Sequence, residues 1–168
     1  MDKDNVILIG MPGSGKSTLG VVLAKMLGYG FIDSDLIIEE EEHRLLHEII
    51  EQEGIEGFAA IENRVNSHIE TTGKVIATGG SVVYCQEAME HLEKIGTVVY
   101  LRWQLEELAE HLGDLNERGV VLKEGQDLKG LYEERCPLYE KYAAITVDCS
   151  GSSIETLAKE VYAHIMGK

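Results

Sequence analysis

A glycine-rich stretch near the N-terminus has the residue types and the spacing that bind phosphate. Residues 10–17 read GMPGSGKS and fit the pattern G-x-x-x-x-G-K-[ST] in full. Glycines allow consecutive backbone N–H groups to curl around phosphate oxygens. Lys16 adds positive charge at the β- and γ-phosphates, and the Ser17 hydroxyl can bind Mg²⁺. An apolar stretch precedes the motif and a helical pattern follows it, so the sequence predicts a nucleoside triphosphate site.

Polar residues also follow two other short apolar stretches. Asp33 and Asp35 come after residues 31–32, and Gly79-Gly80 comes after residues 75–77. In a parallel sheet such residues meet at the carboxyl edge, where ligands bind. One carboxylate can hold the Mg²⁺ shell through water, and the other can accept a proton from an attacking hydroxyl. The two aspartates can also cap the helix that follows, and the glycines can form a plain turn.

The phosphate motif by itself is compatible with three classes of protein: a small-molecule kinase, a nucleotide-hydrolysing switch or motor, and a nucleotide-binding regulator. A switch GTPase needs a base-reading N-K-x-D, which this sequence lacks. A motor typically has an apolar strand that ends in Asp or Asp-Glu, and neither strand end described above fits that pattern well. The residues therefore favour a kinase over a switch or motor.

The elements that must position these residues are read from the hydrophobic pattern. Short apolar stretches at 6–9, 31–32, 75–77, 97–101 and 144–147 predict five strands. Helical patterns separate them, including a long one over 35–72 that is broken near Gly54 and Gly57, and one that ends at Cys136-Pro137. Strands alternating with helices predict a parallel sheet covered on both faces, a three-layer α/β/α fold. The polar stretch 113–126 is long enough to form a mobile lid.

The composition narrows the choice of partners and compartment. The 168 residues fit a single domain, and 15 Lys and Arg against 30 Asp and Glu give a net charge of −15. Such a surface repels nucleic acid and anionic membranes, so neither is an expected partner. The sequence has no signal-peptide pattern, and Cys85, Cys136 and Cys149 match no zinc spacing. We therefore expect a cytoplasmic protein with reduced thiols and a small-molecule substrate.

In combination, these motifs resemble those of the shikimate kinases, within the P-loop nucleoside-monophosphate-kinase-like fold. The resemblance extends over essentially the whole chain. It rests on an ordered set of residues: Gly10–Ser17, Asp33–Asp35, Gly54 with Phe58 and Glu62, Ala77–Gly80, Arg118, and Arg135–Tyr139.

The resemblance implies a fold, a reaction and its cofactors. It implies strand order 2-3-1-4-5, a substrate-binding segment at about 35–72 and a lid at about 112–125. It implies that a monomer uses ATP and Mg²⁺ to convert shikimate into shikimate 3-phosphate, in aromatic amino acid biosynthesis.

The resemblance also implies the roles of individual residues. Lys16 and Arg118 would stabilise charge on the phosphoryl group in transfer, with Arg118 arriving from the lid. Ser17 would bind Mg²⁺ directly and Asp33 through water, while Asp35 would contact the acceptor hydroxyl and act as its base.

Two further sets of contacts follow from the same resemblance. Gly79, Gly80 and Arg135 would hold the acceptor, with the Arg135 guanidinium pairing with its carboxylate. The expected nucleotide-binding residues are Gly10, Gly13, Ser14, Gly15, Lys16, Ser17, Thr18, His111 and Arg118.

The chain departs from the family pattern at the acceptor and at the lid. Ala59 stands where the family motif Phe-Arg-x-x-Glu has arginine, and Ser81 replaces the third glycine of a Gly-Gly-Gly turn. His111 occupies a position that often holds an arginine over the adenine, and the lid reads Arg-Gly-Val-Val from Arg118 where the family has Arg-Pro-Leu-Leu. Arg64 lies further along the helix that carries Ala59, faces another way and is expected to form a surface ion pair.

These changes spare the phosphate site and fall at the acceptor and the lid. The sequence therefore supports kinase chemistry but does not decide which acceptor is phosphorylated. The resemblance implies a shikimate kinase or a divergent kinase of another small hydroxylated carboxylate. A nucleoside-monophosphate kinase would need arginines for a second phosphate, and the 35–72 segment offers only Arg44 and Arg64. A non-catalytic nucleotide-binding regulator is the alternative from a different class, although it would have no use for an acceptor-side base.

Overall fold

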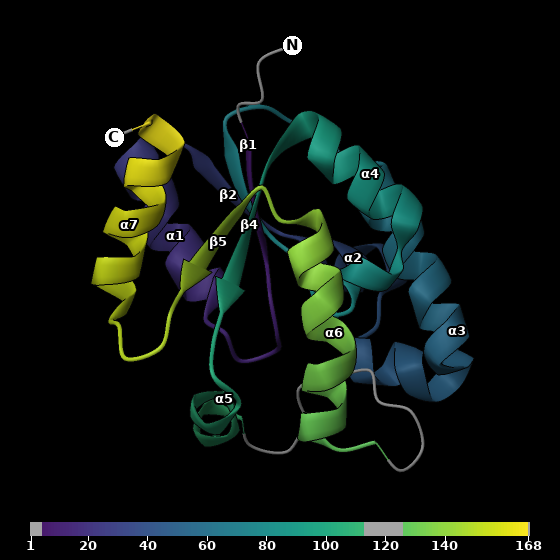
Figure 1. Ribbon diagram of the computed structural model, residues 1–168. Coiled ribbons are helices and arrows are strands. Elements are labelled where there is room, and N and C mark those ends of the chain that lie inside the picture. The colour runs from purple at the N-terminus through teal and green to yellow at the C-terminus, as the bar shows by residue number, and fades with distance from the viewer. Residues whose placement is uncertain (1–4, 113–125, 168) are drawn as a thin grey trace.

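The computed structural model describes residues 5–112 and 126–167. Its centre is a five-stranded parallel sheet in the order β2-β3-β1-β4-β5 (Figure 1), as the resemblance implies. All residues of the middle strand β1 are buried, because helices cover both of its faces. The strands are β1 Asn5–Ile9, β2 Gly30–Asp33, β3 Lys74–Ala77, β4 Gly96–Arg102 and β5 Ile145–Asp148.

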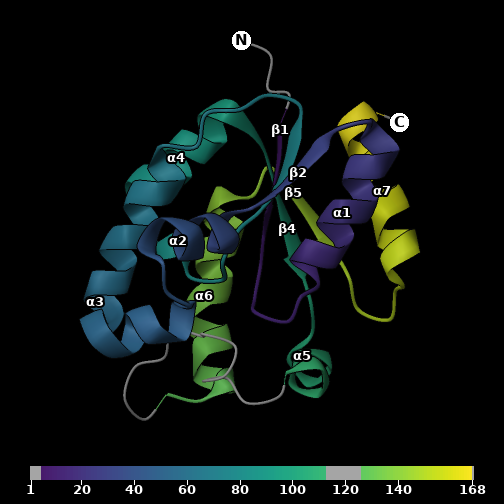
Figure 2. The same cartoon turned by 180° about the vertical axis from the view of Figure 1, so that it is seen from behind.

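Helices lie on both sides of this sheet and complete three layers. Helices α1 and α7 pack together on one face, and α3, α4 and α6 lie on the other (Figures 1 and 2). Among the described residues no helix is long and apolar enough to cross a membrane. The helices are α1 Lys16–Leu27, α2 Ser34–Glu42, α3 Leu46–Ser67, the 3₁₀ turn η1 Val82–Tyr84, α4 Gln86–Ile95, α5 Leu105–His111, α6 Leu128–Tyr142 and α7 Ile154–Met166.

The segment predicted as helical over 35–72 consists of two helices. A turn through His43, whose φ is 53°, separates α2 from α3. The predicted break near Gly54 is confirmed, since this residue has a non-helical φ of 74° inside α3. Gly57 lies in regular helix, so the break expected there is wrong: one left-handed residue is enough to redirect the axis.

A small hydrophobic cluster fixes the two helices of this segment against each other. Ile38 of α2 packs with apolar side chains of α3 and lies apart from the main core around the sheet. The cluster therefore sets where α3 stands relative to the sheet edge. Its buried members are Ile38, Ile49, Phe58, Ile61 and Val65.

Helix α6 continues past the predicted stop at Cys136-Pro137 and ends at Tyr142. Proline removes one backbone donor and disfavours helix, which was the basis of the prediction. Packing outweighs this cost, because Arg135 and Tyr139 on either side of the proline are both buried. The Tyr139 hydroxyl donates a hydrogen bond of 2.6 Å to the Gly80 carbonyl, which ties α6 to the turn after β3.

Candidate functional site

The phosphate motif forms the loop between β1 and α1. Gly13 and Gly15 have φ values of 77° and 82°, in the left-handed region that favours glycine. Gly15 is also the N-cap of α1, so the positive end of that helix faces the loop. Thr18 is exposed in the first turn of α1, next to the loop. The loop therefore has the anion-binding geometry that the sequence predicts.

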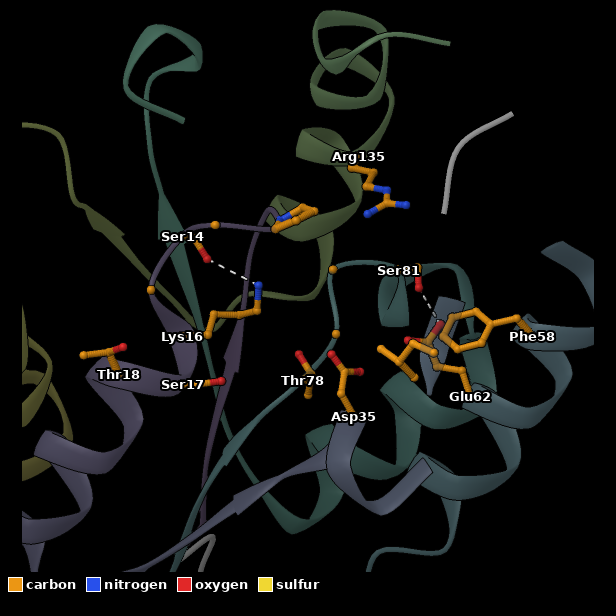
Figure 3. A pocket seen from close by; sticks show the side chains of 16 residues that line it. Ser14, Lys16, Ser17, Thr18, Asp35, Phe58, Glu62, Thr78, Ser81 and Arg135 are labelled. Atoms are coloured by element: carbon orange, nitrogen blue, oxygen red, sulfur yellow. Dashed lines mark hydrogen bonds between the residues drawn. The ribbon is translucent and has the colours of Figure 1, made fainter. Parts of the chain in front are cut away.

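The Lys16 ammonium lies inside this loop and is buried (Figure 3). It donates hydrogen bonds to the carbonyls of Gly10 at 2.8 Å and Met11 at 2.9 Å, and to the Ser14 hydroxyl at 3.3 Å. Burial lowers the pKa of Lys16 to about 8, although the nearby Asp35 carboxylate opposes that shift. A bound phosphate would add negative charge beside the ammonium and favour its charged form.

The two aspartates at the end of β2 and the start of α2 reach the site from different elements. The Ser17 hydroxyl donates a hydrogen bond of 2.9 Å to Asp33 Oδ2. Asp33 Oδ1 accepts one of 3.0 Å from the Asp35 backbone N–H, so Asp33 also caps α2. Strand β2 ends at Asp33, and Asp35 therefore enters the pocket from the first turn of α2 rather than from the strand. The capping role is therefore observed for Asp33, and its other oxygen lies beside the Ser17 hydroxyl.

The Asp35 carboxyl lies against the turn after β3. Burial, and then the Asp33 charge, raises its pKa to about 6, while Lys16 opposes the shift. A Cβ atom at Gly79 would stand 2.6 Å from Asp35 Oδ1 and 3.0 Å from Glu62 Oε2. Only glycine at position 79 therefore allows these two carboxyl groups to approach the turn so closely.

Glu62 is a site residue that the candidate list above omits. It lies on α3 with 1% of its surface exposed, and the Ser81 hydroxyl donates a hydrogen bond of 2.7 Å to its Oε1 (Figure 3). Its Oε2 is buried and has no hydrogen-bond partner among the described residues. Burial raises its pKa to about 7, although the Ser81 hydrogen bond opposes this. The sequence signal for Glu62 as a site residue was its position four residues after Phe58, which puts both side chains on one face of a helix.

Arg135 brings positive charge to the acceptor side. Its side chain is 1% exposed on α6, and its guanidinium carbon lies 5.3 Å from the centre of the Tyr84 ring. A Cβ atom at Gly80 would be 3.0 Å from its NH1 atom. The structure thus places Arg135 beside the Gly79-Gly80 turn, where the resemblance predicts a carboxylate partner.

One pocket of about 260 Å³ joins these parts (Figure 3). The Lys16 ammonium enters it from the phosphate loop, and Asp35, Glu62 and Arg135 enter it from three helices. Two cationic side chains, Lys16 and Arg135, line this pocket although the whole chain has a net charge of −15, so the pocket offers local positive charge to an anionic ligand. Phe58, Thr78 and Ser81 complete the wall opposite the loop.

A further predicted nucleotide contact, His111, lies near Gly13 of the loop. His111, at the end of α5, contacts the Trp103 ring edge-on with 5.1 Å between ring centres. The Trp103 indole N–H donates a hydrogen bond of 2.9 Å to the Ser14 carbonyl, so α5 is anchored to the phosphate loop. Arg118 and the rest of the predicted lid at 113–125 lie outside the described residues.

Arg64 does not take over the acceptor role of the missing arginine. Its guanidinium pairs with Glu42 at 2.9 Å, and its side chain is 53% exposed. The predicted surface ion pair is therefore confirmed.

Comparison with known proteins agrees with this site. The family model for shikimate kinase matches residues 12–166. The chain belongs to the shikimate kinase family. A shikimate kinase of Clostridium botulinum strain Loch Maree is 39% identical over 165 residues, which cover 96% of each protein. That of Thiobacillus denitrificans is 37% identical over 164 residues, covering 95% of this chain and 89% of the relative.

Solved structures of family members have the same fold. Shikimate kinase from Acinetobacter baumannii, in complex with shikimate, superposes with a TM-score of 0.85 and 29% identity. The match covers 98% of this chain and 93% of the other. Family membership and the observed strand order therefore agree with each other.

Proposed function

We propose that this chain transfers the γ-phosphoryl group of ATP to the 3-hydroxyl of shikimate and releases shikimate 3-phosphate and ADP, in aromatic amino acid biosynthesis. The observation that carries the proposal is the single pocket in which a phosphate loop faces Asp35 and Arg135. The family model and the similarity to a shikimate complex support the same reaction.

ATP and Mg²⁺ are the cofactors of the reaction. The loop fits the triphosphate, since Gly13, Ser14 and Thr18 line the pocket and the Lys16 ammonium lies inside the loop, held by the Gly10 carbonyl. Hydroxyl and carboxylate oxygens are the ligands that Mg²⁺ prefers, and Ser17 and Asp33 supply them side by side. When bound, Mg²⁺ neutralises charge on the β- and γ-phosphates.

Asp35 is the proposed base of the reaction. With a pKa of about 6 it is ionised at neutral pH, yet basic enough to take a proton from the attacking hydroxyl. The acceptor oxygen attacks the γ-phosphorus as Asp35 takes that proton, and ADP carries away the electrons of the broken P–O bond. Lys16 stabilises the charge that spreads over the phosphoryl oxygens.

Arg135 is the proposed partner of the acceptor carboxylate. Its buried guanidinium lies beside the Gly79-Gly80 turn, which would present the acceptor to the loop. A planar guanidinium can donate two parallel hydrogen bonds to a carboxylate. Arg118 and His111 are proposed to act from the lid side, on the phosphoryl group and the adenine respectively.

Two further proposals concern the state of the protein. We propose that it acts as a monomer, since one chain supplies the loop, Asp35 and Arg135 of one pocket. We propose a cytoplasmic location, which is supported by three free cysteines. Light scattering of the purified protein and fractionation of the native cells test these two statements.

The test of the function is ADP release from MgATP in a coupled assay, with and without millimolar shikimate. Shikimate-dependent turnover is expected. If the protein binds ATP and phosphorylates another hydroxy acid but not shikimate, that hydroxy acid would replace shikimate as the proposed acceptor. ATP binding without turnover on any acceptor would favour a regulator.

A further inference from the structure

A second cavity, of about 250 Å³, adjoins the pocket described above. The two share Phe58, Glu62 and Ser81 as common walls, so the second cavity opens from the acceptor side of the first. An apolar cavity of about 150 Å³ is already enough to hold benzene. The remaining residues that line it are Ile55, Ala59, Tyr84, Gln126 and Glu134.

The cavity lies where this chain departs from its family. Ala59 contributes only a methyl group to the wall, at the position where the family motif has arginine. Ile55 and Tyr84 line the same space, and both are large apolar side chains with 36% and 40% of their surface exposed. These walls would offer apolar surface to a ligand group, whose burial there would be favourable.

The wall of the cavity also carries two acidic side chains, Glu62 and Glu134, and Glu62 Oε2 has no hydrogen-bond partner among the described residues. Glu62 accepts the hydrogen bond from Ser81, and Glu134 accepts one of 2.6 Å from the Gln126 side-chain amide. None of the described residues that line the cavity is a lysine, arginine or histidine. Among the described residues, a carboxylate entering here would meet the acidic Glu62 and Glu134, whereas a neutral apolar group would meet the apolar walls.

Arg135 lines the first pocket and lies close to one wall of this cavity. Its guanidinium lies over the Tyr84 ring, and Tyr84 is also a wall of the cavity. A carboxyl group held by Arg135 would therefore have one edge toward the guanidinium and the other toward the apolar space beside Ala59.

We propose that the cavity beside Ala59 is a subsite for a small neutral alkyl group on the acceptor's carboxyl function, which makes this chain a kinase for alkyl esters or amides of a shikimate-type acid as well as for the free acid. This inference rests on the proposed function, because it takes Arg135 as the partner of the carboxyl group. Ala59 is then the residue that sets acceptor specificity.

Calorimetric titration of shikimate and its methyl, ethyl and propyl esters into the wild-type protein tests the subsite independently of turnover. Each added methylene is expected to tighten binding about fourfold, the effect of removing one CH₂ from water. Ala59→Leu fills the cavity without adding charge and should abolish this gain. Ala59→Val should give an intermediate slope, and Ala60→Leu, at the exposed neighbouring position, should retain the wild-type slope.

Binding that stays flat or weakens along the ester series in the wild type would overturn the subsite, as would an unchanged slope in folded Ala59→Leu or Ala59→Val. ADP release in the presence of shikimate is measured on the same samples. If shikimate is phosphorylated but affinity does not rise along the ester series, the subsite is refuted and the proposed reaction stands. Ester affinity that rises with chain length while no acceptor is phosphorylated retains the subsite and removes the proposed reaction.

Discussion

The Ser81 hydroxyl and the Glu62 carboxyl form a buried hydrogen bond of 2.7 Å between the turn after β3 and helix α3. Ser81 replaces a family glycine, and Glu62 stands three residues after Ala59, which replaces the family arginine. Residues three apart on a helix share a face, so both departures meet at one carboxyl group. The serine donates to Oε1 of this carboxyl group, while its Oε2 has no partner among the described residues.

Removing this donor should destabilise the fold. Ser81→Ala leaves the buried Glu62 carboxyl without its hydroxyl partner, which typically costs about 1–3 kcal/mol. Urea denaturation at pH 7.5 measures the change in unfolding free energy. In a Glu62→Gln background the same Ser81→Ala change should cost less, and an equal cost in both backgrounds would show that the two residues are not coupled.

Glu62 should also make stability depend on pH. Its pKa is about 7 in the folded protein and near 4.5 when exposed, so between these values the folded state binds a proton that the unfolded state releases. The free energy of unfolding should therefore fall as pH rises from about 5 to 7.5, by on the order of 3 kcal/mol from this group. Asp35, with its pKa raised to about 6, adds a smaller slope of the same sign.

Glu62→Gln should flatten that slope while leaving the part due to Asp35. Unfolding free energies at several pH values between 5 and 8 measure it for both proteins. Glu56→Gln, at an exposed position on the same helix, serves as the control and should keep the wild-type slope. Parallel curves for the wild type and Glu62→Gln would mean that Glu62 titrates normally.

The phosphate loop and the five strands could be predicted because their signals are local, whereas the strand order was implied only by the resemblance to a family. Each strand is a short apolar stretch, and the loop pattern fixes its own backbone through Gly13 and Gly15. The end of α6 could not be predicted in this way. Its continuation past Pro137 depends on Tyr139, whose hydroxyl bonds to Gly80, a residue 59 positions away in the sequence.

The acceptor side shows the same limit. Asp35, Gly79 and Arg135 were predicted from motifs, and the structure brings all three to one pocket. The contact between Glu62 and Ser81 was not predicted, because it depends on how α3 packs against the turn after β3. Ala59 could be recognised as a missing charge from the sequence, but the cavity beside it appears only when Tyr84 and Gln126 are placed around it.

Asp35→Asn should lower kcat by about 10²–10⁴ without unfolding the protein, because the amide cannot take the proton of the acceptor hydroxyl. In the wild type, kcat should rise with pH as Asp35 loses its proton near pH 6. The variant should lack this limb. The measurement is the pH–rate profile with saturating MgATP and acceptor, and a limb that persists in Asp35→Asn would assign it to another group.

Lys16→Met should abolish phosphoryl transfer and leave the fold intact. Burial lowers the pKa of Lys16 to about 8, which shows that the site disfavours its charge before a nucleotide binds. An apolar side chain of similar length removes this buried charge together with the hydrogen bonds to Gly10, Met11 and Ser14, so the unfolding free energy should fall by no more than about 1–3 kcal/mol. Over the same substitution kcat should fall by at least about 10². ADP release and thermal denaturation are measured together, and Lys25→Met, at an exposed position on α1, is the control.

Ala59→Arg should increase the affinity of the acceptor pocket for substrates with a free carboxylate. The new guanidinium would stand three residues before Glu62, whose Oε2 has no partner among the described residues, and would fill the cavity beside it. A gained charged hydrogen bond of about 1.5–3 kcal/mol lowers the KM for shikimate at least about tenfold. Ala60→Arg adds the same charge on the exposed side of α3 and should leave KM unchanged. An equal KM for Ala59→Arg and wild type would show that position 59 does not face the acceptor.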